Sequence, residues 1–188
     1  MMEAILKKEI VVNKVASRII GVITFVILTS LGAFVRIPLP FTPVPITLQT
    51  FFVLLSGVFL GSLGVISQVI YVLLGIAGVP IFSGAGSGLY YLYGPTAGYI
   101  FGFVLATLFL GRFIKQAKDN LFSVFGILCL ADLIILSCGT FWLKIMFGYH
   151  FRNLLLIGFI PFLPGDLLKA LVATTLYLRL KPRLKELF

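Results

Sequence analysis

An acidic and a basic residue lie three positions apart near the start of the last apolar segment of the chain. They are Asp166 and Lys169, in the sequence PGDLLK at 164–169. Residues i and i+3 lie on the same face of a helix, so the two side chains can contact each other. An ionised side chain inside a membrane helix costs about 2.5–3.5 kcal/mol even on a lenient scale. We therefore expect this pair to hold a polar group inside the membrane.

A purely structural interpretation of the pair is also open. Asp166 is a favoured residue type for capping a helix after Pro164 and Gly165, and Lys169 could extend its ammonium group to the headgroup region. However, a lysine in the first turn faces the positive end of the helix dipole, so a negative group should offset it. Asp166 meets this need in part, and an anionic group of a ligand could also meet it.

The composition indicates an all-α integral membrane protein. Of the 188 residues, 60% are hydrophobic and only 11% are charged, and the mean hydropathy is +1.15. A soluble domain carries about 25% charged residues, so this chain has too few polar side chains to cover a water-exposed surface. No polar linker or low-complexity stretch divides the chain, and we expect residues 1–188 to form a single membrane-embedded domain.

Apolar segments separated by glycine and proline predict six membrane-spanning helices in one compact bundle. A proline cluster at 38–45 ends the first segment, and a glycine-rich loop at 83–88 follows the third. The second and third segments are shorter than the roughly 20 residues of a straight crossing. We expect them to be tilted or to contain irregular backbone that the protein shields from lipid. The predicted spans are about 16–35, 46–60, 63–79, 95–114, 121–143 and 161–180.

The distribution of lysine and arginine predicts the orientation in the membrane. With six spans, one side receives three cations and the other side receives eleven, and cytoplasmic loops are the ones enriched in cations. Both termini are therefore predicted to be cytoplasmic in a multi-pass cell-membrane protein. The three are Arg36, Lys144 and Arg152; the eleven are Lys7, Lys8, Lys14, Arg18, Arg112, Lys115, Lys118, Arg179, Lys181, Arg183 and Lys185. The net charge of +9 then reflects topology and contact with anionic membrane lipid, and does not indicate a nucleic-acid partner.

Three stretches of the chain resemble the biotin transporter BioY family, the substrate-binding (S) components of energy-coupling-factor transporters. They are FTPVPITLQ at 41–49, GVPIFSG at 78–84 continuing to GPTAGY at 94–99, and PFLPGDLLK at 161–169. Their order and spacing match that family over nearly the whole chain. The resemblance implies a six-helix, substrate-binding membrane protein that captures biotin from outside. Its pocket would lie near the outer face, under the loops that join spans one to two and three to four.

The resemblance also implies that Asp166 and Lys169 contact biotin, and the chemistry of biotin suits both residues. Biotin offers a carboxylate for a cation, ureido N–H donors for a carboxylate, and an apolar tail and ring system for aromatic side chains. Lys169 would bind the carboxylate or the ureido oxygen. Asp166 would bind an N–H group or orient Lys169, and the sequence leaves both assignments open.

Further ligand contacts are expected from the second span and from the loop after the third. Gln49 lies just inside the second span and can donate and accept hydrogen bonds; a bond to a neighbouring helix is its structural alternative. Gly84 and Gly86 are expected to approach the ligand closely as part of a lid. We select Tyr93 for an aromatic wall of the pocket. The tyrosines that fit such a wall are Tyr90, Tyr91, Tyr93 and Tyr99.

The chain contains no nucleotide-binding GxxxxGK[ST] motif, so it cannot couple ATP hydrolysis by itself. The resemblance implies a separate transmembrane coupling subunit and two ATPase subunits as partners. Ser17 and Gly21 form a small-xxx-small pattern on the first span, and we expect a partner helix to approach there. We expect neither a cofactor nor a bound metal.

Asp132 is the other acidic residue in a predicted span. It is interpreted as a structural residue that hydrogen-bonds a neighbouring helix, although it could join a polar site.

Two alternative functions are open. The first is an S component for another vitamin, such as thiamine or riboflavin. The second is a membrane enzyme that would pair Ser87 with His150, the only histidine. We expect the chain not to be an enzyme, because both residues fall in loops.

Overall fold

The computed structural model of the chain describes residues 14–184, and most of them are helical. Lys7, Lys8 and Lys185, which contribute to the predicted orientation, lie outside the described residues. In chain order the elements are α2 (Lys14–Phe34), β1 (Arg36–Ile37), β2 (Ile46–Thr47), α3 (Gln49–Leu60), α4 (Ser62–Ile76), η1 (Leu89–Tyr93), α5 (Ala97–Phe113), η2 (Ile114–Gln116), α6 (Leu121–Phe147), α7 (Phe151–Gly158) and α8 (Leu163–Leu184).

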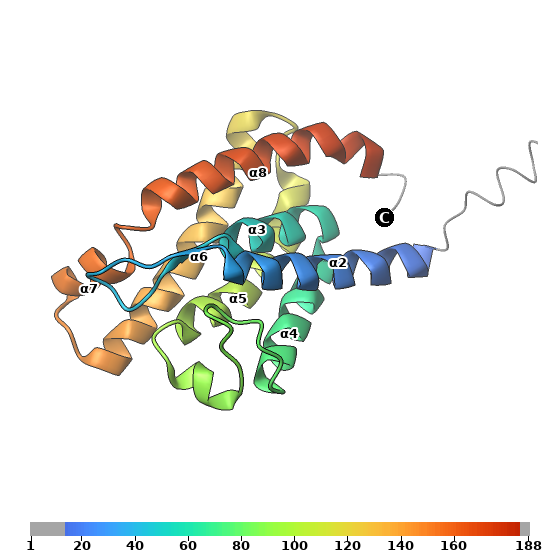
Figure 1. Cartoon of the computed structure of the whole chain (residues 1–188). Coiled ribbons are helices and arrows are strands. Elements are labelled where there is room, and N and C mark those ends of the chain that lie inside the picture. The colour runs from blue at the N-terminus through green and yellow to red at the C-terminus, as the bar shows by residue number, and fades with distance from the viewer. Residues whose placement is uncertain (1–13, 185–188) are drawn as a thin grey trace, which may run out of the picture.

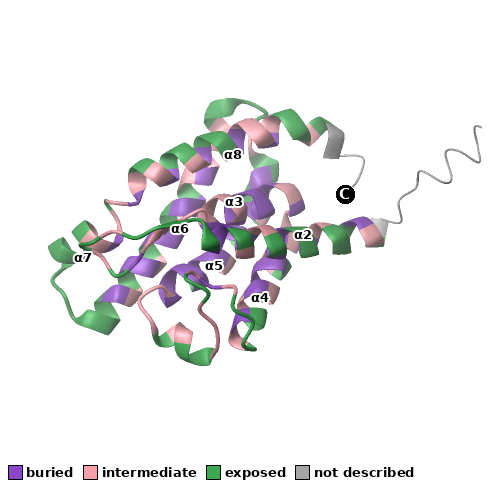
Figure 2. Cartoon of the chain, in the orientation of Figure 1, coloured by how far each residue is buried: buried purple, intermediate pink, exposed green. Residues whose placement is uncertain are grey.

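Helix α3 lies at the centre of the bundle. It packs against α2, α4, α5 and α8, and Figure 1 shows it between α2 and α8. Because it is surrounded, eight of its 12 residues are buried, which fits a helix that is apolar nearly all round. Figure 2 shows the same arrangement, with buried residues on the inner helices and exposed residues on the outward sides of α2 and α7.

Large aliphatic side chains cover the outward face of α2. Ile19, Ile23, Ile27 and Leu31 are each more than half exposed. They follow one another at four-residue steps, so they form one continuous stripe along the helix. A soluble monomer rarely exposes a large contiguous apolar patch, whereas lipid tails accommodate it without cost. The stripe is the surface expected of a helix that faces a membrane.

Three helices of the described chain are long and apolar enough to cross a membrane, namely Val15–Phe34, Ala97–Gln116 and Leu121–Phe147. Helices α7 and α8 meet at a bend of 49° and together make a fourth candidate span. Helices α3 and α4, with 12 and 15 residues, are shorter apolar helices, as expected for the second and third segments. The prediction of a helical membrane bundle is confirmed, with three to four full-length spans.

The observed helices differ from the predicted spans mainly at their ends. The second helix begins at Gln49 rather than at 46, because residues 46–47 pair with β1 in a short hairpin. The fifth predicted span, which is α6, continues to Phe147 rather than ending at 143. Gly148 ends this helix with a φ of +63°. Helix α7 was not predicted, since eight residues are too few to produce a clear periodic pattern.

Helices α5 and α6 approach each other closely at glycines. A Cβ atom on Gly102 would lie 2.8 Å from the Cα of Ile135, and one on Gly98 would lie 2.6 Å from the carbonyl oxygen of Cys138. Small residues at such contacts allow membrane helices to pack backbone against backbone. This packing holds Tyr99 and Phe103 of α5 in buried positions inside the bundle.

We expect Gly102→Ala to lower the melting temperature of the purified protein. The added methyl group forces one helix to shift, and overpacking of this kind costs about 1–3 kcal/mol. Gly126→Ala on α6 is the matched control, because a Cβ there meets nothing within 4 Å. Thermal unfolding in detergent measures both variants. A Gly102→Ala variant as stable as the wild type would contradict the close packing of α5 and α6.

Candidate functional site

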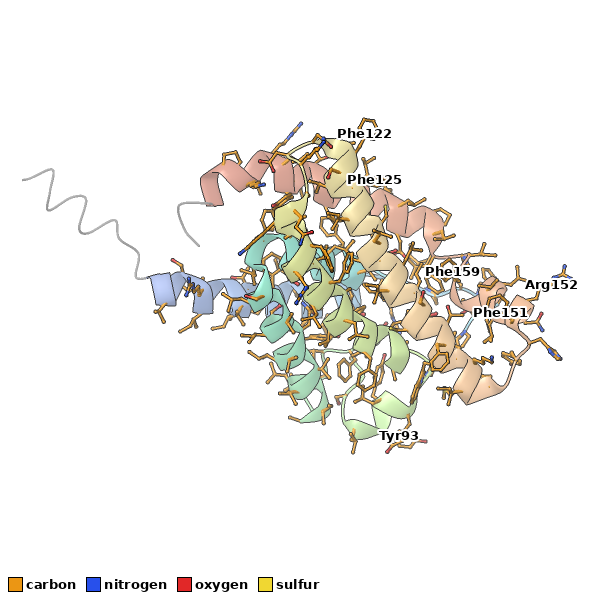
Figure 3. All side chains as sticks on the ribbon, turned by 180° about the vertical axis from the view of Figure 1, so that it is seen from behind. Tyr93, Phe122, Phe125, Phe151, Arg152 and Phe159 are labelled. Carbon is orange, nitrogen blue, oxygen red and sulfur yellow. The ribbon has the colours of Figure 1, made fainter. Side chains whose placement is uncertain are left out.

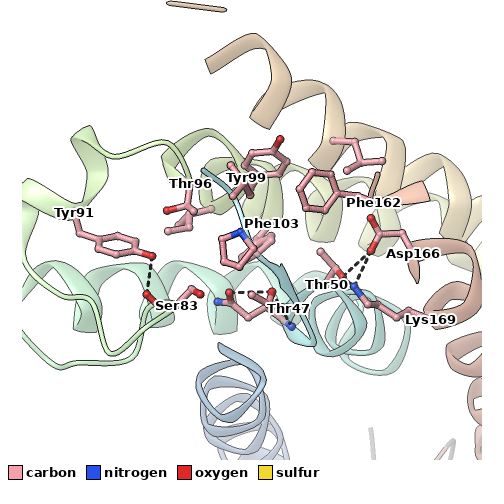
Figure 4. A pocket seen from close by; sticks show the side chains of 15 residues that line it. Thr47, Thr50, Ser83, Tyr91, Thr96, Tyr99, Phe103, Phe162, Asp166 and Lys169 are labelled. Carbon is pink, nitrogen blue, oxygen red and sulfur yellow. Dashed lines mark hydrogen bonds and ion pairs between the residues drawn. The ribbon is translucent and has the colours of Figure 1, made fainter. Parts of the chain in front are cut away.

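A cavity lies at the end of the bundle where the segments 35–48 and 77–96 connect the helices. Its volume, counted together with the open space at its mouth, is about 490 Å³. Figure 4 shows Asp166 and Lys169 at one end of it and Ser83 and Tyr91 at the other, with Phe103 between them. We call this space the main cavity. Its lining residues are Val44, Pro45, Thr47, Gln49, Thr50, Ser83, Tyr91, Thr96, Tyr99, Ile100, Phe103, Leu136, Phe162, Asp166 and Lys169.

Asp166 and Lys169 form an ion pair in the main cavity, as their spacing predicts. The Nζ of Lys169 lies 2.8 Å from Oδ1 of Asp166. The Thr50 hydroxyl joins the pair from α3, accepting a hydrogen bond from Lys169 at 3.0 Å and donating one to Asp166 at 3.2 Å. The side chains of Asp166 and Lys169 are only 4% and 13% exposed. Lys169 therefore points into the protein, which excludes its extension to the headgroup region.

The first turns of two helices bring these three residues together. Helix α8 begins at Leu163, and the backbone amide of Asp166 donates to the carbonyl of Phe162 at 2.9 Å. Helix α3 begins at Gln49, one residue before Thr50. The N-terminal end of a helix carries a partial positive charge, so both helix starts favour a carboxylate at the position of Asp166.

Gln49 lies on the cavity wall, where it supports a second buried residue. Its side-chain amide donates to the Tyr71 hydroxyl at 2.5 Å, and its carbonyl accepts from Thr47 at 3.2 Å. The Tyr71 hydroxyl in turn donates to the carbonyl of Ile81 at 3.1 Å. Gln49 therefore lines the predicted site and also makes the interhelical hydrogen bond that was its structural alternative.

Tyr91 and Tyr99 line the main cavity, whereas the selected Tyr93 does not and lines a neighbouring hollow instead. Tyr93 is 65% exposed and lies at the edge of the molecule in Figure 3. Side chains two positions apart on a 3₁₀-helix point in different directions, and η1 directs Tyr91 inward. The Tyr91 ring stacks on Phe82 at 4.9 Å, and its hydroxyl donates to the Ser83 carbonyl at 3.0 Å. Burial raises the pKa of Tyr91, which keeps this donor protonated.

Gly84 and Gly86 do not line the main cavity, contrary to the prediction that they approach a ligand there. Each makes room for another side chain of the protein. A Cβ on Gly84 would lie 2.5 Å from Nη1 of Arg36, and Gly84 has a φ of +76° that favours glycine. A Cβ on Gly86 would collide with the ring of Tyr91.

Several cavity residues were not predicted from the sequence. Thr50 directly follows the predicted contact Gln49, and Phe162 lies four residues before the predicted contact Asp166. These sequence positions were the available signal. Phe103 had no such signal, because one phenylalanine among 19 carries no chemical pattern. Within residues 14–184, no group of His, Cys, Asp or Glu side chains could hold a metal ion.

Asp132 is buried but does not make the predicted interhelical hydrogen bond. It is 4% exposed, and its Oδ1 has no hydrogen-bond partner among the described residues. It lies one helical turn before Leu136, which lines the main cavity. Its carboxyl group is within electrostatic range of Asp166 and Lys169, so it adds to the polar environment beneath the site.

Ser17 is not available to a partner helix, contrary to the prediction for Ser17 and Gly21. Ser17 is only 8% exposed, because this side of α2 packs against α3 and α4 of the same chain. Gly21 is half-buried. The accessible side of α2 is the aliphatic stripe described above, so small residues do not form the surface that α2 presents outward.

The fold is that of a helical membrane protein with a cavity at one end of the bundle, into which an ion pair projects. Residues 4–186 match the model of the BioY family, and the chain belongs to that family. A probable biotin transporter BioY from Pyrococcus horikoshii is 40% identical over 159 residues, which cover 84% of this chain and 91% of the relative. The biotin transporter BioY from Thermotoga maritima shows the same identity and coverage.

A solved structure has the same architecture. The crystal structure of the S component for biotin from an ECF-type ABC transporter superposes with a TM-score of 0.86 at 25% sequence identity. The match covers 92% of this chain and 95% of the solved chain. The predicted family is therefore confirmed, and the chain has the fold of an S component.

The ion pair predicts a characteristic double-mutant cycle. We expect Lys169→Met to reduce the free energy of unfolding by about 3–5 kcal/mol, because it leaves Asp166 charged and buried without its partner. Asp166→Asn combined with Lys169→Met should recover part of that loss, since no uncompensated charge remains. Thermal unfolding of the two single variants and the double variant measures the coupling. A double variant whose loss equals the sum of the single losses would contradict the ion pair.

Proposed function

We propose that this chain binds biotin at the outer face of the cell membrane and takes it up as the S component of an energy-coupling-factor transporter. Family membership supports this function, as do the relatives named biotin transporters and the solved S component for biotin. The observation that carries the proposal is the Asp166–Lys169 pair with Thr50. Together they offer a carboxylate, an ammonium group and a hydroxyl within 3.2 Å of one another.

The charge balance of this cluster favours the ureido ring of biotin over its carboxylate. Asp166 and Lys169 neutralise each other, so a second carboxylate beside Lys169 would also be repelled by Asp166. A ureido group is neutral and has one acceptor oxygen and two N–H donors. Lys169 would donate to the ureido oxygen, and Asp166 would accept from an N–H group.

Aromatic side chains give the same cavity a surface for the apolar part of biotin. Phe103 and Phe162 are buried and line the main cavity with Tyr99. The rings of Tyr99 and Phe162 lie 5.9 Å apart. A small-molecule site that combines an apolar wall with a few convergent polar groups is the usual form of a ligand pocket.

The chain works with partners that supply energy. The sequence of this chain contains no GxxxxGK[ST] nucleotide-binding motif. A transmembrane coupling subunit and two ATPase subunits would therefore drive release of biotin into the cytoplasm. Because Ser17 is buried, the aliphatic stripe of α2 is the part of that helix open to a partner or to lipid.

The whole chain would form one membrane-embedded domain with six crossings and both termini in the cytoplasm. The arrangement of cations supports this orientation. Arg18, Lys115 and Lys181 line one hollow beside the C-terminal end of α3, and Lys181 pairs there with Asp119. The main cavity lies at the other end of α3, so the cation-rich end is the cytoplasmic one.

We expect Asp166→Asn and Lys169→Met each to weaken biotin binding by more than 1 kcal/mol, because each removes a charged hydrogen-bond partner. Isothermal titration of the purified protein in detergent measures this effect. Thiamine and riboflavin should not compete with biotin, which separates this function from that of an S component for another vitamin.

Matched controls for these variants lie at the opposite end of the bundle. Asp119→Asn and Lys115→Met make the same chemical changes far from the main cavity, and both should leave biotin affinity unchanged. Wild-type affinity in Asp166→Asn and in Lys169→Met would refute the assigned site.

The proposed orientation predicts which engineered cysteines face the outside. In a variant whose Cys129 and Cys138 are replaced by alanine, Arg152→Cys should react with a membrane-impermeant maleimide in intact cells. Lys118→Cys should react only after the membrane is opened. Labelling of Lys118→Cys in intact cells would show that the orientation is reversed.

A further inference from the structure

A second hollow adjoins the main cavity and contains an arginine. It measures about 890 Å³, its open face included, and Arg36 is the charged residue in its lining. The two spaces share four wall residues, so they lie side by side, and Arg36 is close enough to Tyr91 of the shared wall to interact with it electrostatically. The shared residues are Pro45, Ser83, Tyr91 and Thr96. Arg36 therefore lies beside the end of the main cavity that Ser83 and Tyr91 line.

The short hairpin β1–β2 directs Arg36 toward this site. Its register pairs Arg36 with Thr47, and directly opposite residues of an antiparallel pair project from the same face. Thr47 lines the main cavity, so Arg36 projects from the cavity side of the hairpin. Although Arg36 is an exposed residue, the loop at Gly84 packs against its guanidinium group, where any side chain at position 84 would displace it.

The guanidinium group of Arg36 has no ionic partner within residues 14–184. The ion pairs of the described chain join Lys169 to Asp166 and Lys181 to Asp119. Arg36 thus differs from Lys169, whose charge Asp166 already balances. Its planar donors are free to bind a carboxylate in two-point contact.

We propose that Arg36 binds the free carboxylate of the ligand, while Asp166 and Lys169 bind the neutral ring at the other end of the main cavity. This inference rests on the proposed function and extends it, because it makes the site selective for a molecule with a neutral polar head and an anionic tail. The tail would run past Phe103 toward Tyr91 and Ser83. Gly84 then serves the site indirectly, by leaving room for the arginine.

Titration of two ligands against two variants tests the role of Arg36. The ligands are biotin and biotin amide, in which a neutral amide replaces the carboxylate. The wild type should bind biotin about tenfold more tightly than the amide, as expected for one charge-assisted contact at a partly exposed site. Arg36→Gln should weaken biotin binding about tenfold and leave amide binding within about twofold. Arg152→Gln, which removes an exposed cation of α7, should change neither affinity.

The outcomes separate this inference from the proposed function. Equal affinity of the wild type for biotin and its amide would overturn the role of Arg36 without use of any variant. An Arg36→Gln variant that keeps full biotin affinity, or that loses both ligands equally, would overturn it as well. A wild type that binds neither ligand would instead refute biotin binding itself, and this inference with it.

Discussion

The buried charges of Asp166 and Lys169 must be paired, and this requirement constrains how helices α3 and α8 pack. Removing a carboxylate and an ammonium group from water costs several kcal/mol for each ion. This cost is offset only if the two ions pair in good geometry and their remaining donors and acceptors are hydrogen-bonded. Asp166 and Lys169 meet at 2.8 Å, and Thr50 bonds to both. Because Thr50 belongs to α3 and the pair belongs to α8, the first turns of these helices must lie side by side. The central, buried position of α3 is consistent with this need.

Aromatic donors stabilise the irregular segments around the site. Backbone carbonyls that lie outside helices need hydrogen-bond partners wherever lipid or protein excludes water. Tyr71, Tyr91 and Tyr99 donate to the carbonyls of Ile81, Ser83 and Gly158, respectively. Trp142 donates to the carbonyl of Gly94 at 2.9 Å. These bonds hold the loop 77–96 and the end of α7 against the bundle, where Ser83, Tyr91 and Thr96 of the loop line the main cavity.

The sequence was sufficient for features that depend on composition or on local spacing. The membrane class, the main helices and the contact of Asp166 with Lys169 follow from apolar runs and from i, i+3 geometry. Features set by tertiary packing were not predictable in the same way. The direction of each tyrosine of η1 depends on the stacking of Tyr91 against Phe82, so the sequence did not show that Tyr91 rather than Tyr93 lines the main cavity. The burial of Ser17 depends on which side of α2 meets α3 and α4, which is a matter of tertiary packing that the sequence of α2 does not show.

A structure determined with biotin bound would test the central claim most directly. The claim is that a neutral polar head group completes an already balanced ion pair at the start of α8. It predicts the ureido oxygen within about 3.2 Å of Lys169 Nζ and a ureido N–H directed at Asp166. A ligand bound elsewhere, or a biotin carboxylate seated directly on Lys169, would contradict the account.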